Sequence, residues 1–93
     1  MAELPGRLQP CKHVLATVAG DQTVLLDVEA GEYYTLNRVG GRIWTLLGDR
    51  LPVAAIVEQI AAEFDAPVER IDADVREHIT NLLSMSLVEP VAD

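Results

Sequence analysis

The stretch "GEYYTLNRVGGRIWTLL", residues 31–47, decides the fold, because it passes from a strand pattern to a helix pattern within a few residues. Two of the four aromatic residues in the chain, Tyr33 and Tyr34, stand side by side near its start. Successive side chains of a strand point to opposite faces, so Tyr34 and Leu36 share one face and Tyr33 and Thr35 share the other. The pattern predicts a strand whose inner face carries Tyr34 and Leu36.

The second half of this stretch predicts a helix that begins directly after the strand. Asn37 is a favoured N-cap residue, and Gly48 is placed to end the helix. Glycine inside a helix costs about 1 kcal/mol relative to alanine. Gly40 and Gly41 therefore indicate that another part of the chain packs closely against this helix. Its apolar face consists of Ile43, Trp44, Leu46 and Leu47.

Two further strands are predicted before residue 31, in "HVLATV" and "TVLLDV", with turns at "AGDQ" and "EAG". Alternation of apolar residues between turns is typical of an antiparallel meander. The pattern places Val14, Ala16 and Val18 on one shared face of the first strand. In the second strand it places Val24, Leu26 and Val28 on a shared apolar face, with Thr23 and Asp27 pointing away.

Two more helices are predicted after residue 50. "LPVAAIVEQIAAEF" carries Pro52 in its first turn and apolar residues at helical spacing, and a last helix runs from about Val68 to Met85. The apolar stripe of the last helix consists of Ile71, Val75, Ile79, Leu82 and Leu83. The predicted fold class is α+β and winged helix-turn-helix-like, with a three-stranded antiparallel sheet followed by three helices.

Length and composition favour one small globular domain. The 93 residues suffice for a single domain over residues 1–93, whose first ten residues are expected to be flexible. No apolar run approaches the roughly 20 residues that span a membrane, and the N-terminus lacks the apolar core of a signal peptide. With Cys11 as the single cysteine, no disulfide forms within the chain. We expect a cytoplasmic protein that does not bind membranes, either a monomer or a dimer.

The distribution of charge argues against nucleic acid as a partner. The net charge is −8, and residues 51–93 hold nine acidic residues against Arg70 and Arg76. Proteins that bind nucleic acids neutralise phosphates with lysine and arginine, so this half has the wrong sign. A DNA-binding winged helix has the same elements and remains an alternative. The charge favours a neutral or basic partner instead.

Residues suited to catalysis or metal binding are sparse. Cys11 and His13 lie two residues apart, and the other histidine is His78 in the last predicted helix, too few ligands for a zinc site. Asp74 and Glu77 are helical neighbours that fit either a solvated face or the capture of a basic partner. We therefore expect no enzyme activity, no metal and no cofactor.

The tyrosine strand is the stronger lead to function. Both outer strands of a three-stranded meander are edges that leave backbone N–H and C=O groups unpaired. Such an edge accepts a peptide as an added strand, with tyrosine as a suitable neighbour. The alternative is that tyrosine simply favours strands and that Tyr34 fills the core.

The combined pattern resembles the PqqD family of precursor-peptide recognition elements. The family's glycine turn, aromatic strand, "LN", small residues and "IW.LL" correspond here to Gly31, Tyr34, Leu36, Asn37, Gly40, Ile43, Trp44, Leu46 and Leu47. The resemblance extends over roughly residues 10 to 88. Two departures fall at helix ends: Ser86 replaces a glycine before the final leucine, and Gly48 precedes Asp49 where "DG" is commoner.

The resemblance implies that the chain binds the leader of a ribosomally made precursor peptide and catalyses nothing itself. The leader would add as a strand beside the third strand and against the third helix. It would then be presented to a separate leader peptidase, as in lasso-peptide pathways. Pyrroloquinoline-quinone or another such pathway, or a pure scaffold for an enzyme, are the alternatives. The implied peptide-binding residues are Glu32, Tyr33, Tyr34, Thr35, Leu36, Asp72, Val75, Arg76, Ile79, Leu82 and Leu83.

Overall fold

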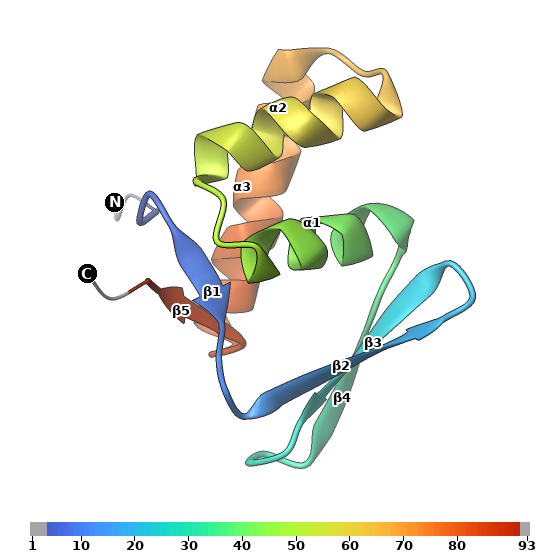
Figure 1. Cartoon of the computed structure of the whole chain (residues 1–93), viewed down its shortest axis with the longest axis vertical. Coiled ribbons are helices and arrows are strands. Elements are labelled where there is room, and N and C mark those ends of the chain that lie inside the picture. Colours follow the sequence, from blue (N-terminus) through green and yellow to red (C-terminus); the bar gives the residue numbers. More distant parts are fainter. Residues whose placement is uncertain (1–3, 92–93) are drawn as a thin grey trace.

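The computed structural model describes residues 4–91, with a three-stranded antiparallel sheet beneath a group of three helices (Figure 1). The elements are β1 (Leu8–Pro10), β2 (Val14–Ala19), β3 (Gln22–Asp27), β4 (Glu32–Leu36), α1 (Arg38–Gly48), α2 (Val53–Phe64), α3 (Val68–Ser84) and β5 (Val88–Pro90). The main sheet has the order β2-β3-β4, and both pairings are antiparallel. The predicted α+β, winged helix-turn-helix-like fold with its meander is confirmed.

The middle strand β3 turns the opposite face toward the core from the one its pattern suggested. Leu25 is fully buried and Asp27 is 5% exposed, whereas Val24 and Leu26 are only partly buried. Asp27 points inward because its Oδ1 accepts hydrogen bonds from the backbone N–H groups of residues 29 and 30, at 3.1 and 3.0 Å. Three consecutive apolar residues, "VLL", also leave the alternating pattern without a unique phase.

A second, two-stranded sheet joins the two ends of the described chain, and the sequence pattern did not predict it. β1 pairs antiparallel with β5, with Leu8 opposite Pro90. Residues 1–10 were expected to be flexible, but Leu8 in β1 is fully buried in the core. Residues 1–3 lie outside the described part. Three-residue strands that each contain proline carry too little alternation to be recognised from sequence.

The helix ends match the predictions except at Gly48. Asn37 caps α1, since its Oδ1 accepts a hydrogen bond from the Gly40 N–H at 2.8 Å. Gly48 lies within α1, and the left-handed residue after the helix is Arg50, with φ of 60°. The helical hydrogen bonding does not stop before Gly48, because the N–H of Asp49 still donates to the Thr45 carbonyl. Ser86 also has a φ of 60°, the left-handed conformation that glycine adopts without strain.

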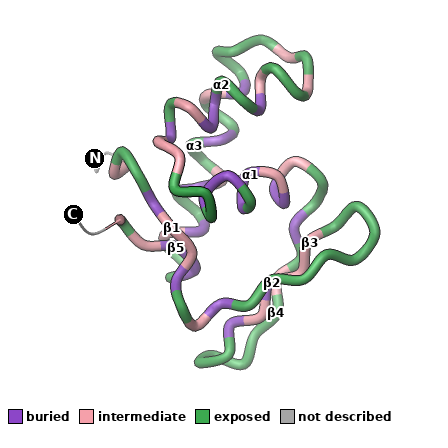
Figure 2. The backbone as a smooth tube through the Cα atoms, viewed as in Figure 1, coloured by how far each residue is buried: buried purple, intermediate pink, exposed green. Residues whose placement is uncertain are grey.

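The adjacent glycines of α1 lie where other elements approach it, as predicted. A Cβ atom on Gly41 would lie 2.5 Å from Thr23 Oγ1 of β3, and one on Gly40 would lie 3.2 Å from His78 Cε1 of α3. Figure 2 shows buried residues along α1, while the far end of the β2–β3 hairpin is exposed. The two glycines thus let α1 pack against the sheet on one side and against α3 on the other.

Candidate peptide-binding site

The β4 edge of the main sheet is open within residues 4–91, because β4 pairs with β3 on one side only. The N–H of Val28 donates to the His13 carbonyl across β2 and β3, at 3.0 Å. Backbone N–H and C=O groups of successive residues in a strand point to alternate sides. Since the Val28 N–H is directed to β2, the backbone groups of Leu25, three residues earlier, are directed to β4. There they form hydrogen bonds with the backbone groups of Tyr34, the partner of Leu25 in β4. The backbone N–H and C=O groups of Tyr33 and Thr35 are therefore directed to the open edge.

The two tyrosines of β4 lie on opposite faces of the sheet, as predicted. Tyr34 is partly buried against the core, and its hydroxyl donates to the Glu32 carboxylate at 2.8 Å. This hydrogen bond raises the pKa of Tyr34. Tyr33 is 71% exposed on the outer face, where it lines a shallow apolar hollow with Leu15 and Leu26. Leu36 is 8% exposed and belongs to the core.

A hollow of about 260 Å³ lies between α1 and α3, at the point where β4 ends. Its lining is mostly aliphatic, with a few polar groups. The missing side chain of Gly40 leaves room for it on the α1 side. Asn37 of this lining comes directly after Leu36, so the hollow borders the end of β4. The lining residues are Asn37, Val39, Gly40, Ile43, Ile60, Ile71, Asp74, Val75 and His78.

His78 stands out in this lining, because its Nε2 is a buried atom with no hydrogen-bond partner. It is the one side-chain nitrogen or oxygen in the described part of the chain with this property. Burial also lowers the pKa of His78, which favours the neutral imidazole. Sequence reasoning did not single out His78 as a site residue, since a lone histidine beside an apolar stripe has no pattern of its own. Gly40, which makes room for the ring, was the available signal.

The predicted peptide-binding residues of α3 do not all lie near this hollow. Val75 lines it, while Ile79 and Leu82 are fully buried in the core and Leu83 packs against the core. Asp72 and Arg76 form an ion pair with each other at 2.8 Å. A helix turns about 100° per residue, so this pair lies on the flank of the buried stripe opposite to His78. A role for Asp72, Arg76 and Leu83 in peptide binding stays a prediction.

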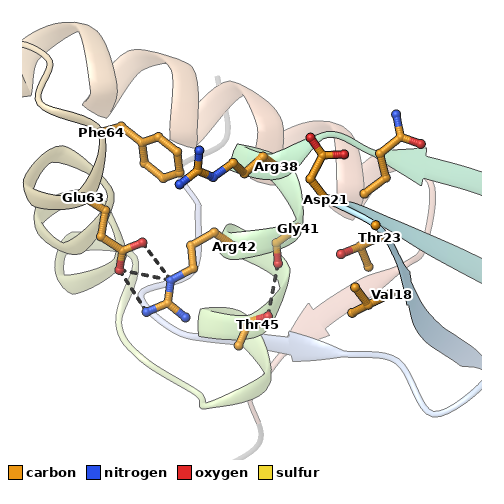
Figure 3. A pocket seen from close by; sticks show the side chains of 11 residues that line it. Val18, Asp21, Thr23, Arg38, Gly41, Arg42, Thr45, Glu63 and Phe64 are labelled. Atoms are coloured by element: carbon orange, nitrogen blue, oxygen red, sulfur yellow. Dashed lines mark hydrogen bonds and ion pairs between the residues drawn. The ribbon is translucent and has the colours of Figure 1, made fainter.

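A larger cleft, of about 470 Å³, lies on the opposite side of α1, toward the β2–β3 hairpin (Figure 3). Two nitrogens of Arg42 donate to the Glu63 carboxylate of α2 at 2.8 to 3.0 Å. This hydrogen bonding lowers the pKa of Glu63. Arg38 lies over the Phe64 ring, 5.6 Å from its centroid. Three of the charged groups of this cleft, those of Arg38, Arg42 and Glu63, thus already have partners within the protein.

Neither metal ligation nor a membrane span is found over residues 4–91. No group of three or more His, Cys, Asp or Glu side chains in this range is placed to hold a metal ion. Cys11 is buried, and the pKa of its thiol is raised by burial. None of the helices in this range is both long enough and apolar enough to cross a bilayer.

Comparisons with known proteins agree with this arrangement. The family model described as "Coenzyme PQQ synthesis protein D (PqqD)" matches residues 22–88. The solved structure "TbiB1 in Complex with the TbiA(beta) Leader Peptide" is 32% identical, with a TM-score of 0.83, and the match covers 91% of this chain and 99% of that chain. "Lasso peptide synthetase B1 complexed with the leader peptide" is 22% identical and shares the fold, with a TM-score of 0.81 over 89% of this chain and 98% of that chain. No curated protein matches the chain.

Proposed function

Because the chain belongs to the PqqD family, we propose that it binds the leader segment of a ribosomally made precursor peptide. The similarity to a solved leader-peptide complex, at 32% identity over nearly the whole of both chains, supports this proposal. The observation that carries it is the open β4 edge, where Tyr33 and Thr35 present unpaired backbone groups next to an apolar hollow. A peptide strand satisfies such groups and gains affinity from its backbone.

In this proposal the protein performs no chemistry and acts by holding the precursor beside a separate leader peptidase. Tethering of this kind converts a weak encounter into a nearly intramolecular one. Of the possible pathways, that of a lasso peptide is favoured, because both similar structures are leader-peptide complexes and one of them is a lasso peptide synthetase B1 that shares the fold. The precursor is made in the cytoplasm, so binding takes place there.

Two proline variants test strand addition at β4. Thr35→Pro removes an N–H that is directed to the open β4 edge, and no hydrogen bond of the β3–β4 ladder depends on that N–H. Ala16→Pro is the matched control, since alternation along β2 directs its N–H to the open edge on the other side of the sheet. The probe is a synthetic leader peptide from the precursor gene that adjoins this chain's own gene, titrated by calorimetry.

We expect Thr35→Pro to weaken binding by about ten-fold or more, because a hydrogen bond is lost and the proline ring obstructs the incoming strand. Ala16→Pro should bind like the wild-type chain. Equal losses in both variants, with unchanged thermal unfolding, would argue against the β4 edge. If the wild-type chain does not bind the leader at tens of micromolar, leader recognition is wrong for that peptide and a scaffold role gains support.

A further inference from the structure

The main sheet has a second open edge, formed by β2, on the side away from β4. Within residues 4–91, β2 pairs in this sheet with β3 alone. Residues 15–19 are all exposed, so neither face of the strand is covered along them (Figure 2). The helices leave this edge free, because α1 packs mainly against the other two strands of the sheet.

The β2 strand lacks the features that usually keep an edge strand from pairing with another chain. Natural edges are protected by charged side chains, by proline or by a bulge. The six residues "VLATVA" contain no charge and no proline, and their register with β3 is continuous from Val14 to Ala19. Leu15 is 58% exposed and Val18 is 75% exposed. The β2 edge therefore offers both backbone hydrogen bonds and apolar side chains to another strand.

We propose that two copies of the chain associate through their β2 edges, in antiparallel orientation, and form one six-stranded sheet. Val14, Ala16 and Val18 direct their backbone groups to this edge, by the alternation along β2. Ala16 can therefore pair with Ala16 of the second copy, which places Val14 opposite Val18. This register keeps the helices of both copies on the same face of the sheet. Both copies use the same surface, as a twofold axis requires.

The charges at the two ends of β2 favour this arrangement, although each chain carries a net charge of −8. Lys12 precedes the strand and Asp21 follows it, and both are exposed. Neither side chain forms an ion pair within residues 4–91. The antiparallel pairing brings Lys12 of each copy to the end of the other β2, where Asp21 lies. Opposite charges at neighbouring cross-strand positions attract each other, and the twofold axis makes this contact twice.

Pairing through β2 does not compete with the binding of a peptide at β4. The order of the sheet is β2-β3-β4, so the two β4 strands would lie at the two outer edges of the six-stranded sheet. Each copy keeps its own β4 edge unpaired. The dimer would therefore present two separate β4 edges, and its formation does not depend on the proposed function.

Sedimentation equilibrium between about 1 μM and about 1 mM tests for the dimer. We expect the mass of the wild-type chain to rise from that of one copy, 10.1 kDa, to twice that value. Ala16→Pro removes the central N–H directed to the β2 edge, and it should raise the dissociation constant by about ten-fold or more. Thr35→Pro is the matched control, because it alters the β4 edge instead, and it should dimerise like the wild type.

Reversal of charge tests the register without placing a proline in the sheet. Lys12→Glu and Asp21→Lys should each raise the dissociation constant by about five-fold, because each replaces two attractive contacts in the dimer by two repulsive ones. The double variant, Lys12→Glu with Asp21→Lys, should dimerise nearly as tightly as the wild type. These differences should decrease at high salt.

A wild-type chain that stays monomeric up to about 1 mM would overturn this inference. Loss of the dimer in Thr35→Pro but not in Ala16→Pro would also overturn it, because the copies would then pair through β4. So would a double charge variant that dimerises no better than the two single variants, because the antiparallel register would be wrong. Failure to bind the leader peptide would count against the proposed function and leave this inference intact.

Discussion

Helix α1 separates two hollows that differ in the chemical groups that line them. Toward α3, Gly40 borders a small, mostly aliphatic hollow whose lining includes His78, a residue with a buried Nε2 that has no partner. Toward the hairpin, Gly41 borders a larger cleft in which Arg42 and Glu63 bind each other. Most charged groups of the larger cleft are paired within the protein, whereas the smaller hollow is lined mainly by aliphatic side chains. We therefore take an apolar lining beside an open strand edge, rather than volume, as the guide to the proposed binding site.

The largest expected effect concerns Gly41, because the sheet side of α1 leaves no room for a side chain. In Gly41→Ala the added Cβ would lie 2.5 Å from Thr23 Oγ1, so the Thr23 side chain, the sheet or the helix has to shift. We expect the free energy of unfolding to fall by about 1–3 kcal/mol, measured by urea denaturation.

A substitution at the adjacent position, Gly40, should have a much smaller effect on stability. In Gly40→Ala the nearest atoms lie at 3.2 to 3.3 Å, and the gain in helix propensity of about 1 kcal/mol offsets the crowding. Its stability should stay close to that of the wild type. Adding Thr23→Ala to Gly41→Ala should restore most of the loss. Equal destabilisation by the two alanine variants would contradict the different packing on the two sides of α1.

A smaller effect is expected in the pH dependence of stability, which concerns His78 on the α3 side of α1. Burial lowers the pKa of His78 below its ordinary value of 6.5, so the unfolded chain binds more protons between the folded pKa and 6.5. The free energy of unfolding should therefore fall as the pH is lowered through this window. Thermal unfolding from about pH 7.5 to about pH 5 should show this dependence, and His78→Leu should reduce it.

The control for this pH dependence is Asp74→Asn, since Asp74 is the other titratable residue in the lining of the hollow. That variant should retain the fall in stability between pH 6.5 and the lower folded pKa of His78. A dependence just as steep in His78→Leu as in the wild type would mean that the imidazole does not cause it.

The smallest effect is expected for the ion pair in the larger cleft. The hydrogen bond from Arg42 lowers the pKa of Glu63, so the pair stabilises the protein above the ordinary pKa of 4.5. This contribution is lost as the pH falls through the folded pKa. Both groups are exposed, so solvent and salt screen the pair. Glu63→Gln should lower the unfolding temperature slightly at low salt, less at high salt, and leave peptide affinity unchanged.

The order of the central elements could be predicted because each carries a strong local signal. Asn37 marks the start of α1, and the alternation of Tyr34 with Leu36 fixes the inner face of β4. The inner face of β3 could not be predicted, since Leu25 stands among apolar neighbours and Asp27 turns inward to bind backbone N–H groups. That contact depends on a turn that forms only in the folded chain.

The candidate site was predictable only in part, for a related reason. Repeating patterns indicate which residues are buried, and they assigned Val75, Ile79 and Leu82 to one stripe of α3. They do not indicate which flank of that stripe faces a neighbouring hollow. His78 and Asp74 on one flank and Asp72 and Arg76 on the other are equally polar in sequence, and only the packing of α3 against α1 distinguishes them.

The pairing of β1 with β5 has a practical consequence for linking this protein to other molecules. The two described ends lie side by side, on the far side of α1 from β4 (Figure 1). A fluorescent reporter, a surface tether or a fused enzyme domain attached at either end would leave from that region and keep the β4 edge accessible. Fusions at the two ends should therefore be nearly interchangeable, with linker length setting the reach of the attached domain.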